Sequence, residues 1–202
     1  MTVHTVVVFD LGNVLIGWDR ELLFSQLIDD ADELDHFLNE VYSLEANREL
    51  DRGVPLPDVV AALSIRHPEY QTVFEAFGQR WIETIAGAID GSVEILEELH
   101  TRWTPLYALS NWGADTFAIV EHEFSFLRLF DGLVISGREG VVKPDRAIFD
   151  LMCERHGFRP AEALFIDDSE TNVEAAHALG FDTVLFTGPE QLRAELTTRN
   201  LL

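Results

Sequence analysis

Short apolar runs alternate with amphipathic stretches along the second half of the chain. Apolar runs that stop at a polar residue or a turn predict strands buried on both faces of a sheet, and they occupy residues 105–110, 132–136, 163–167 and 183–186. The stretches around them carry apolar residues at helical spacing and predict helices over 92–100, 114–123, 145–156, 170–179 and 189–198. Strands that alternate with helices predict an α/β fold with a doubly wound parallel sheet.

The first strand is predicted near the N-terminus, where the apolar run Thr5–Phe9 ends at a carboxylate, Asp10. Gly12 and Asn13 follow, and both tolerate the positive φ of a tight turn. An aspartate at the carboxyl end of a buried first strand lies where open α/β sheets bind their ligands. We therefore expect the functional site to be built around Asp10.

The stretch between Ile16 and Arg102 follows a different pattern, with apolar residues at helical spacing and no convincing strand. Helices are predicted over 19–30, 33–42, 57–65 and 71–85, and the aromatic residues of the last one are expected in a helical core. The stretch is too long for a simple connection. We interpret residues 16–89 as an inserted all-helical cap, and residues 1–15 and 90–202 as the α/β core.

Composition narrows the class of protein. The chain has 202 residues, of which 47% are hydrophobic, enough for one α/β domain with an insertion. A net charge of −22 argues against nucleic acid or an anionic membrane as partner. The single cysteine, Cys153, excludes an internal disulfide. Without a leader pattern or an apolar stretch of membrane-spanning length, we expect a soluble cytoplasmic protein; the oligomeric state stays open.

Polar groups stand at the ends of the predicted strands and at the start of one helix. They are Asp10, Ser110, Asn111, Asp167, Asp168 and Lys143, the last being the sole lysine among 14 basic residues. Each alone could cap a turn or a helix, but together they form a chemical set. Crowded carboxylates call for a divalent cation, and oxygen-only ligands favour Mg²⁺. A hydroxyl, backbone amides and an ammonium suit a phosphate group.

The same residues fall into four motifs that resemble those of the haloacid dehalogenase (HAD) superfamily, hydrolases with an aspartate nucleophile. The motifs are Phe9–Leu15, Leu109–Asn111, Val142–Pro144 and Phe165–Asn172. Their order and spacing, and the helical insertion after the first motif, resemble the members with a C1-type cap. The resemblance covers essentially the whole chain and is more specific than any one short pattern. It implies a Rossmann-like core.

The resemblance implies a role for each motif residue. Asp10 would be the nucleophile and form an aspartyl-phosphate. Asp10, Asp168 and the backbone carbonyl of Gly12 would bind Mg²⁺, with Asp167 and Asn172 supporting the metal site.

The remaining motif residues would bind the transferred group. Ser110 and the amide of Asn111 would hold the phosphoryl group, and Lys143 would neutralise the charge that develops on it. The implied activity is the Mg²⁺-dependent hydrolysis of a phosphomonoester, with a small phosphorylated metabolite as substrate.

Gly12 departs from the pattern, because phosphatases of this superfamily usually carry an acid–base aspartate there. Such catalysis is worth about 10²–10⁴-fold. The substrate could have a good leaving group, as a sugar 1-phosphate has, and the Leu-Gly-Asn-Val motif resembles the α-D-glucose-1-phosphate phosphatase subgroup. An acid could instead come from the cap, with Asp19 and Glu49 as candidates. The protein could also be slow or inactive.

Two other functions remain as alternatives. A 2-haloacid dehalogenase uses the same nucleophile and lacks the second aspartate, but it does not usually keep an acidic pair such as Asp167-Asp168. A non-catalytic binding protein of the same fold would agree with Gly12, whereas the presence of Asp10 and Lys143 opposes it.

Overall fold

The computed structural model describes residues 6–202, so residues 1–5, the start of the predicted core segment 1–15, lie outside the described residues. Its centre is a five-stranded sheet in the order β5-β4-β1-β6-β7, and all neighbouring strands run parallel. The strands are β1 (Val6–Phe9), β4 (Leu106–Ser110), β5 (Gly132–Ile135), β6 (Ala163–Asp167) and β7 (Asp182–Leu185). The predicted α/β class with a parallel sheet is confirmed.

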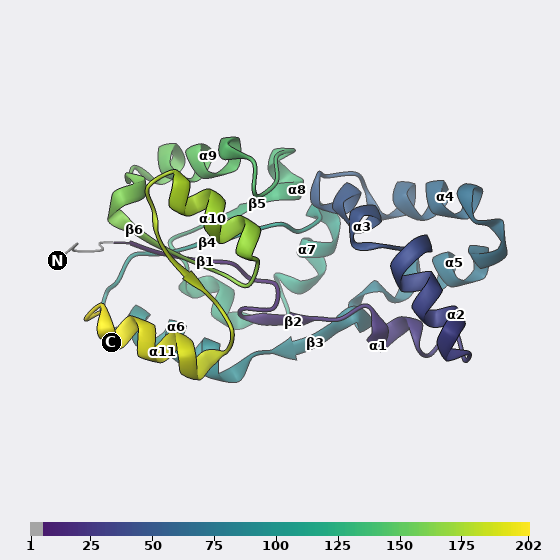
Figure 1. The fold of residues 1–202 in the computed structure, drawn as a ribbon, viewed down its shortest axis with the longest axis horizontal. Helices are drawn as coiled ribbons and strands as arrows, with labels where there is room; N and C mark the ends of the chain where they lie inside the picture. Colours follow the sequence, from purple (N-terminus) through teal and green to yellow (C-terminus); the bar gives the residue numbers. More distant parts are fainter. Residues whose placement is uncertain (1–5) are drawn as a thin grey trace.

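Helices cover both faces of the sheet (Figure 1). α6 (Asp90–Thr101) and α11 (Pro189–Thr198) lie on one face, and α9 (Arg146–His156) and α10 (Glu170–Ala178) lie on the other. Every residue of β1 is buried, and its side chains alternate between two hydrophobic clusters, Val7 and Phe9 in one and Val6 and Val8 in the other. This two-sided burial explains why the strands read as continuous apolar runs.

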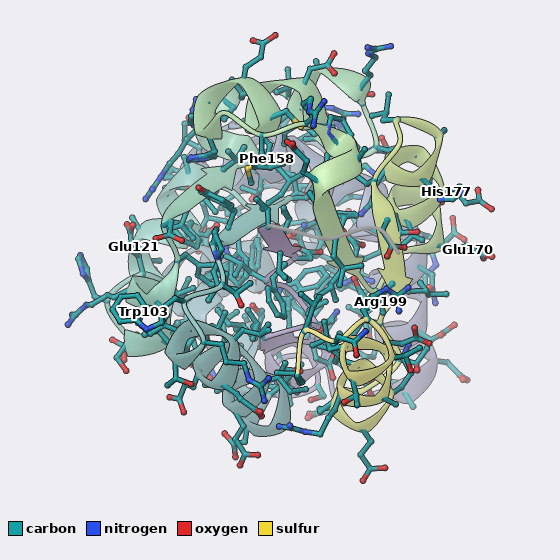
Figure 2. All side chains as sticks on the ribbon, turned by 90° about the vertical axis from the view of Figure 1, so that its left-hand side faces the viewer. Trp103, Glu121, Phe158, Glu170, His177 and Arg199 are labelled. Carbon is teal, nitrogen blue, oxygen red and sulfur yellow. The ribbon has the colours of Figure 1, made fainter. Side chains whose placement is uncertain are left out.

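Charged side chains surround this core on the side away from the insertion. Figure 2 views that end of the molecule, with Glu170 and His177 at the periphery and apolar side chains filling the centre. Trp103 is 91% exposed and contributes little to the core. Within residues 6–202, no helix combines the length and the apolar character that a membrane-spanning segment needs.

The insertion forms a second lobe beside the sheet (Figure 1). It contains α1 (Glu21–Phe24), α2 (Ala31–His36), a π-helical turn (Phe37–Val41), α3 (Leu44–Asp51), α4 (Leu56–Arg66) and α5 (Gln71–Arg80). Its core is aromatic: the ring of Phe24 lies 4.8 Å from that of Phe37 and 5.4 Å from that of Phe77. Because these rings are fully buried, the lobe is held by its own packing.

Two strands join the lobes, so the expectation of no strand between Ile16 and Arg102 is wrong. β2 (Ile16–Trp18) pairs antiparallel with β3 (Ile85–Ala88). Both strands are short and contain a glycine, which removes the apolar run that marks a strand in the sequence. The cap boundaries at 16 and 89 stay a prediction. The helix predicted over 19–30 is shorter than expected, because α1 ends at Phe24.

The end of α3 packs against α8 (Ser136–Glu139) of the core. Gly53 has φ +95°, and a Cβ there would stand 2.6 Å from the carbonyl oxygen of Gly137, so a side chain cannot be accommodated. The Ser136 hydroxyl donates to the backbone carbonyl of Asp51 at 2.6 Å and accepts from the backbone N–H of Trp112 at 2.9 Å. These contacts fix the end of α3 against the core.

Candidate active site

Three carboxylates meet at the carboxyl ends of β1 and β6. An oxygen atom from each of Asp10, Asp167 and Asp168 lies within 4.8 Å of the others. The sheet topology causes this, since β1 and β6 are neighbours with Phe9 in register with Ile166. The backbone N–H of Asp10 continues the ladder and donates to the carbonyl of Ile166 at 2.8 Å.

Lys143 places a buried ammonium among these groups. Its Nζ atom lies 2.9 Å from Oδ2 of Asp10 and 2.6 Å from Oδ2 of Asp167. It also donates to the carbonyl oxygen of Leu109 at 2.9 Å. These three acceptors use the three donors of an ammonium group, an arrangement that the planar fork of an arginine would not reproduce.

Two asparagines hold the loops of the cluster. Asn111 forms a reciprocal pair with the backbone of Lys143: its Nδ2 donates to the carbonyl at 2.9 Å, and its Oδ1 accepts from the N–H at 2.8 Å. Nδ2 of Asn172 donates to Oδ1 of Asp167 at 3.0 Å. Ser110 is buried at the end of β4, one residue before Asn111. The structure thus brings Asp10, Ser110, Asn111, Lys143, Asp167, Asp168 and Asn172 together at the carboxyl ends of β4, β1 and β6.

The cluster carries an excess of negative charge. Burial raises the pKa of Asp10 to about 7; Lys143 opposes this effect, and Asp167 and Asp168 add to it. Burial and the neighbouring Asp167 also raise the pKa of Asp168. Burial alone would lower the pKa of Lys143, but the charges of Asp10 and Asp167 raise it. Three carboxylates against one ammonium fit a divalent cation that prefers oxygen ligands, as Mg²⁺ does.

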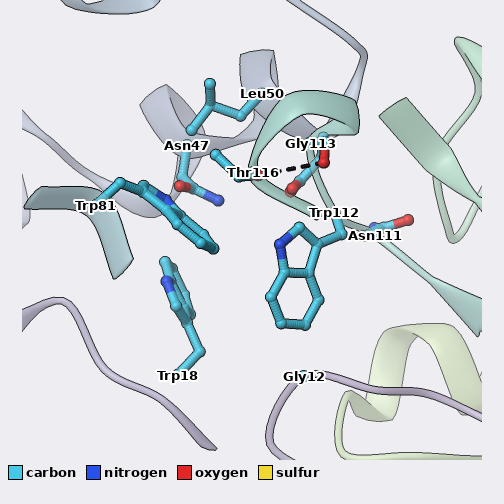
Figure 3. Close-up of a pocket in the computed structure, with 10 residues that line it drawn as sticks. Gly12, Trp18, Asn47, Leu50, Trp81, Asn111, Trp112, Gly113 and Thr116 are labelled. Carbon is cyan, nitrogen blue, oxygen red and sulfur yellow. Dashed lines mark hydrogen bonds between the residues drawn. The ribbon is translucent and has the colours of Figure 1, made fainter. Parts of the chain in front are cut away.

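A pocket opens beside the cluster and is lined by residues of both the core and the cap. In Figure 3 the indoles of Trp18, Trp81 and Trp112 are grouped around its space, and Gly12 lies on the loop at one side. Asn47 also lines it; because its Oδ1 accepts from the hydroxyl of Tyr42 at 2.7 Å, its Nδ2 is left as a donor. The pocket combines flat apolar walls with a few polar groups, as small-molecule sites do.

Sequence reasoning missed several pocket residues. Trp81, expected in the cap core, is buried and also lines the pocket. Trp18, Asn47 and Asp51 line it without having been predicted. No local signal marks them, since their position depends on how the cap docks on the core.

The two acids proposed from the sequence lie elsewhere. Asp19 is exposed, and its Oδ1 accepts from the backbone N–H of Glu21 at 2.9 Å. Glu49 is exposed and pairs with Arg52 at 3.1 Å. Neither side chain lines the pocket.

A parallel sheet whose strand ends carry an acidic cluster, with an inserted helical lobe beside it, is a capped α/β architecture. The model of the haloacid dehalogenase-like hydrolase family matches residues 4–180. The chain therefore belongs to this family of hydrolases.

Several known proteins resemble the chain over nearly its whole length. It is 26% identical to the D-ribitol-5-phosphate phosphatase of Bacteroides thetaiotaomicron, over 95% of this chain and 96% of that protein. It is also 26% identical to the drimenol cyclase drtB of Aspergillus calidoustus, but it spans 35% of the length of that protein. A HAD-family enzyme of Bacteroides thetaiotaomicron, crystallised with magnesium and inorganic phosphate, has a TM-score of 0.72 at 22% identity, covering 92% of this chain and 95% of that one.

Proposed function

We propose that this chain is a Mg²⁺-dependent phosphomonoester hydrolase that acts on a small phosphorylated metabolite. The observation that carries the proposal is the pairing of Asp10 with the buried ammonium of Lys143 within the acidic cluster. The likeness to a ribitol phosphate phosphatase supports it.

The residues divide the work of the reaction among them. Asp10 attacks phosphorus and forms an aspartyl-phosphate, which water then hydrolyses. Asp10, Asp168 and the carbonyl of Gly12 would hold Mg²⁺, and the ion would offset the charge of the carboxylates that face an anionic substrate.

Further residues position the phosphoryl group and the nucleophile. Ser110 and the backbone amide of Asn111 bind the phosphoryl oxygens, and Lys143 offsets the charge that develops on them. Asp167 and Asn172 act behind them: Asp167 holds the Lys143 ammonium at 2.6 Å, and Asn172 holds Asp167 at 3.0 Å.

The pocket supports a polyhydroxylated metabolite as substrate. Indole faces such as those of Trp18 and Trp81 pack on the C–H faces of sugars and polyols, while the amide of Asn47 can bond a hydroxyl group. Sugar 1-phosphates belong to this class. Their anomeric oxygen also leaves with less help from an acid, which suits a site with Gly12 in place of the usual aspartate.

Hydrolysis of p-nitrophenyl phosphate tests the proposal, since this leaving group needs little protonation. We expect turnover that depends on Mg²⁺, stops with chelator, and falls on the order of 10³-fold or more in Asp10→Asn. Asp58→Asn, an exposed position on α4, is the control and keeps full activity. Sugar 1-phosphates and 6-phosphates are compared next. Release of halide from 2-chloropropionate by a protein without phosphatase activity would overturn the proposal.

A further inference from the structure

One acidic residue lines the same pocket as Gly12, the position at which the family's usual acid is missing. Ten residues line the pocket within the described chain, and Asp51 is the one among them with an ionisable side chain. Gly12 lines the same pocket. Asp51, from the cap, and Gly12, from the core, therefore line the same pocket.

We propose that Asp51 is the general acid and base of this enzyme, in place of the aspartate that phosphatases of this superfamily usually carry at the position of Gly12. The inference rests on the proposed phosphatase function. It makes Asp51 a catalytic residue that the cap delivers to the leaving group.

The backbone of Asp51, rather than its carboxyl group, anchors the residue. Ser136 donates to the Asp51 carbonyl at 2.6 Å, and the close approach of Gly53 to Gly137 holds the following turn. The backbone of Asp51 is thus fixed against the core, at a position that lines the pocket. A Cβ on Gly12 would meet no heavy atom within 4 Å, so the space on the core side is open to a leaving group.

The surroundings of Asp51 suit a group that exchanges a proton near neutral pH. Burial raises its pKa to about 6, while the charges of Lys143, Arg48 and Arg52 act in the opposite direction. Tyr42, buried beside α3, stays protonated because burial raises its pKa well above the ordinary value. A carboxyl group that titrates near the working pH is efficient as both acid and base.

The proton follows a closed cycle. As the Asp10 oxygen bonds to phosphorus, the bond between phosphorus and the ester oxygen breaks, and the Asp51 carboxyl proton passes to that oxygen. The alcohol leaves. The Asp51 carboxylate then takes a proton from a water molecule whose oxygen attacks phosphorus. The bond between Asp10 and phosphorus breaks, phosphate is released, and both aspartates return to their starting states.

The test compares two substrates that differ in leaving group, p-nitrophenyl phosphate and glycerol 2-phosphate, in the wild type and in Asp51→Asn. For glycerol 2-phosphate, kcat/KM falls about 10²–10⁴-fold, because an alkoxide must be protonated as it leaves. For p-nitrophenyl phosphate, kcat/KM changes less than about tenfold, since this ratio reports the step that forms the aspartyl-phosphate. In the wild type we expect kcat/KM for glycerol 2-phosphate to decline above about pH 6, as the Asp51 carboxyl group ionises. Asp51→Asn should lose this decline. Glu49→Gln, exposed on the same helix, is the matched control.

A rescue variant separates proton transfer from structural damage. Adding Gly12→Asp to Asp51→Asn restores kcat/KM for glycerol 2-phosphate at least about tenfold, because the new carboxyl group enters the open space at position 12. Equal losses for both substrates, or no loss for glycerol 2-phosphate, would overturn the role of Asp51 while leaving the phosphatase function intact. No Asp10-dependent hydrolysis of p-nitrophenyl phosphate by the wild type would overturn the function itself, and the role of Asp51 with it.

Discussion

Asp51 links the chemistry of the pocket to the stability of the protein. Because burial raises its pKa from 3.8 to about 6, the folded state binds more protons at this group than the unfolded state does over that interval. Ionisation of Asp51 therefore lowers the free energy of unfolding as the pH rises from about 4 to about 6.

Replacing Asp51 by asparagine removes this dependence. Relative to the wild type, we expect Asp51→Asn to gain stability as the pH rises through this interval and to keep the gain above it. At about 1.4 kcal/mol per pKa unit, the gain is at most about 3 kcal/mol. Urea unfolding at several pH values, with chelator present, measures the difference. A difference that stays constant from pH 4 to pH 7 would contradict the burial of an ionisable Asp51.

Single residues also show what the sequence could and could not predict. Asp10, Ser110 and Asp167 end neighbouring strands, so their meeting follows from the strand order of a parallel sheet. The roles given to them stay predictions. Asp51 could not be found in the same way, because the face that the end of α3 presents to the pocket is set by packing between distant segments. Trp18 was missed for the same reason.

At the scale of elements, Ser136 connects the cap to the core. Its hydroxyl bonds the carbonyl of Asp51 and the N–H of Trp112, so one buried side chain ties α3 of the cap to the loop after β4. An alanine there leaves both backbone groups without this partner.

We expect Ser136→Ala to lower the free energy of unfolding by about 1–3 kcal/mol, the cost of unsatisfied buried polar groups. It should also reduce hydrolysis of glycerol 2-phosphate more than that of p-nitrophenyl phosphate, because the end of α3 carries Asp51. Ser64→Ala is the control, since its hydroxyl bonds a carbonyl of its own helix at 2.8 Å. Equal effects of the two variants would argue against the connection.

The helices and strands differ in how well the sequence predicts them. The core strand β6 was predicted at its observed bounds, and β4 to within one residue, because short continuous apolar runs indicate burial on both faces. β2 and β3 were missed because each is short and contains a glycine, and because they exist only as a pair. β2 and β3 pair because the two segments that connect the lobes lie side by side. A local sequence pattern does not encode that arrangement.

At the scale of the whole molecule, the net charge of −22 repels an anionic substrate. A phosphomonoester is itself an anion and must approach an acidic protein. Lys143 offsets one of the three clustered carboxylates, so a bound divalent cation supplies the rest of the local positive charge. The same acidic surface draws Mg²⁺ toward the protein, and added salt screens this attraction.

Thermal unfolding with and without Mg²⁺ measures this coupling in the whole protein. At about 100 times its dissociation constant, Mg²⁺ stabilises the fold by about 2.7 kcal/mol, which raises Tm by roughly 5–10 °C. We expect this shift in the wild type and in Glu154→Gln, an exposed control on α9, and not in Asp168→Asn.

Without Mg²⁺, Asp168→Asn should melt at the same temperature as the wild type or above it. The reason is that the substitution relieves a crowded carboxylate whose pKa is raised by burial and by Asp167. Loss of the Mg²⁺ shift together with this gain would identify Asp168 as a metal ligand. Its charge would then lower stability without Mg²⁺ and bind the ion when Mg²⁺ is present. An equal Mg²⁺ shift in Asp168→Asn would instead place the ion elsewhere on the acidic surface, and the site at the edge of the sheet would then need another explanation.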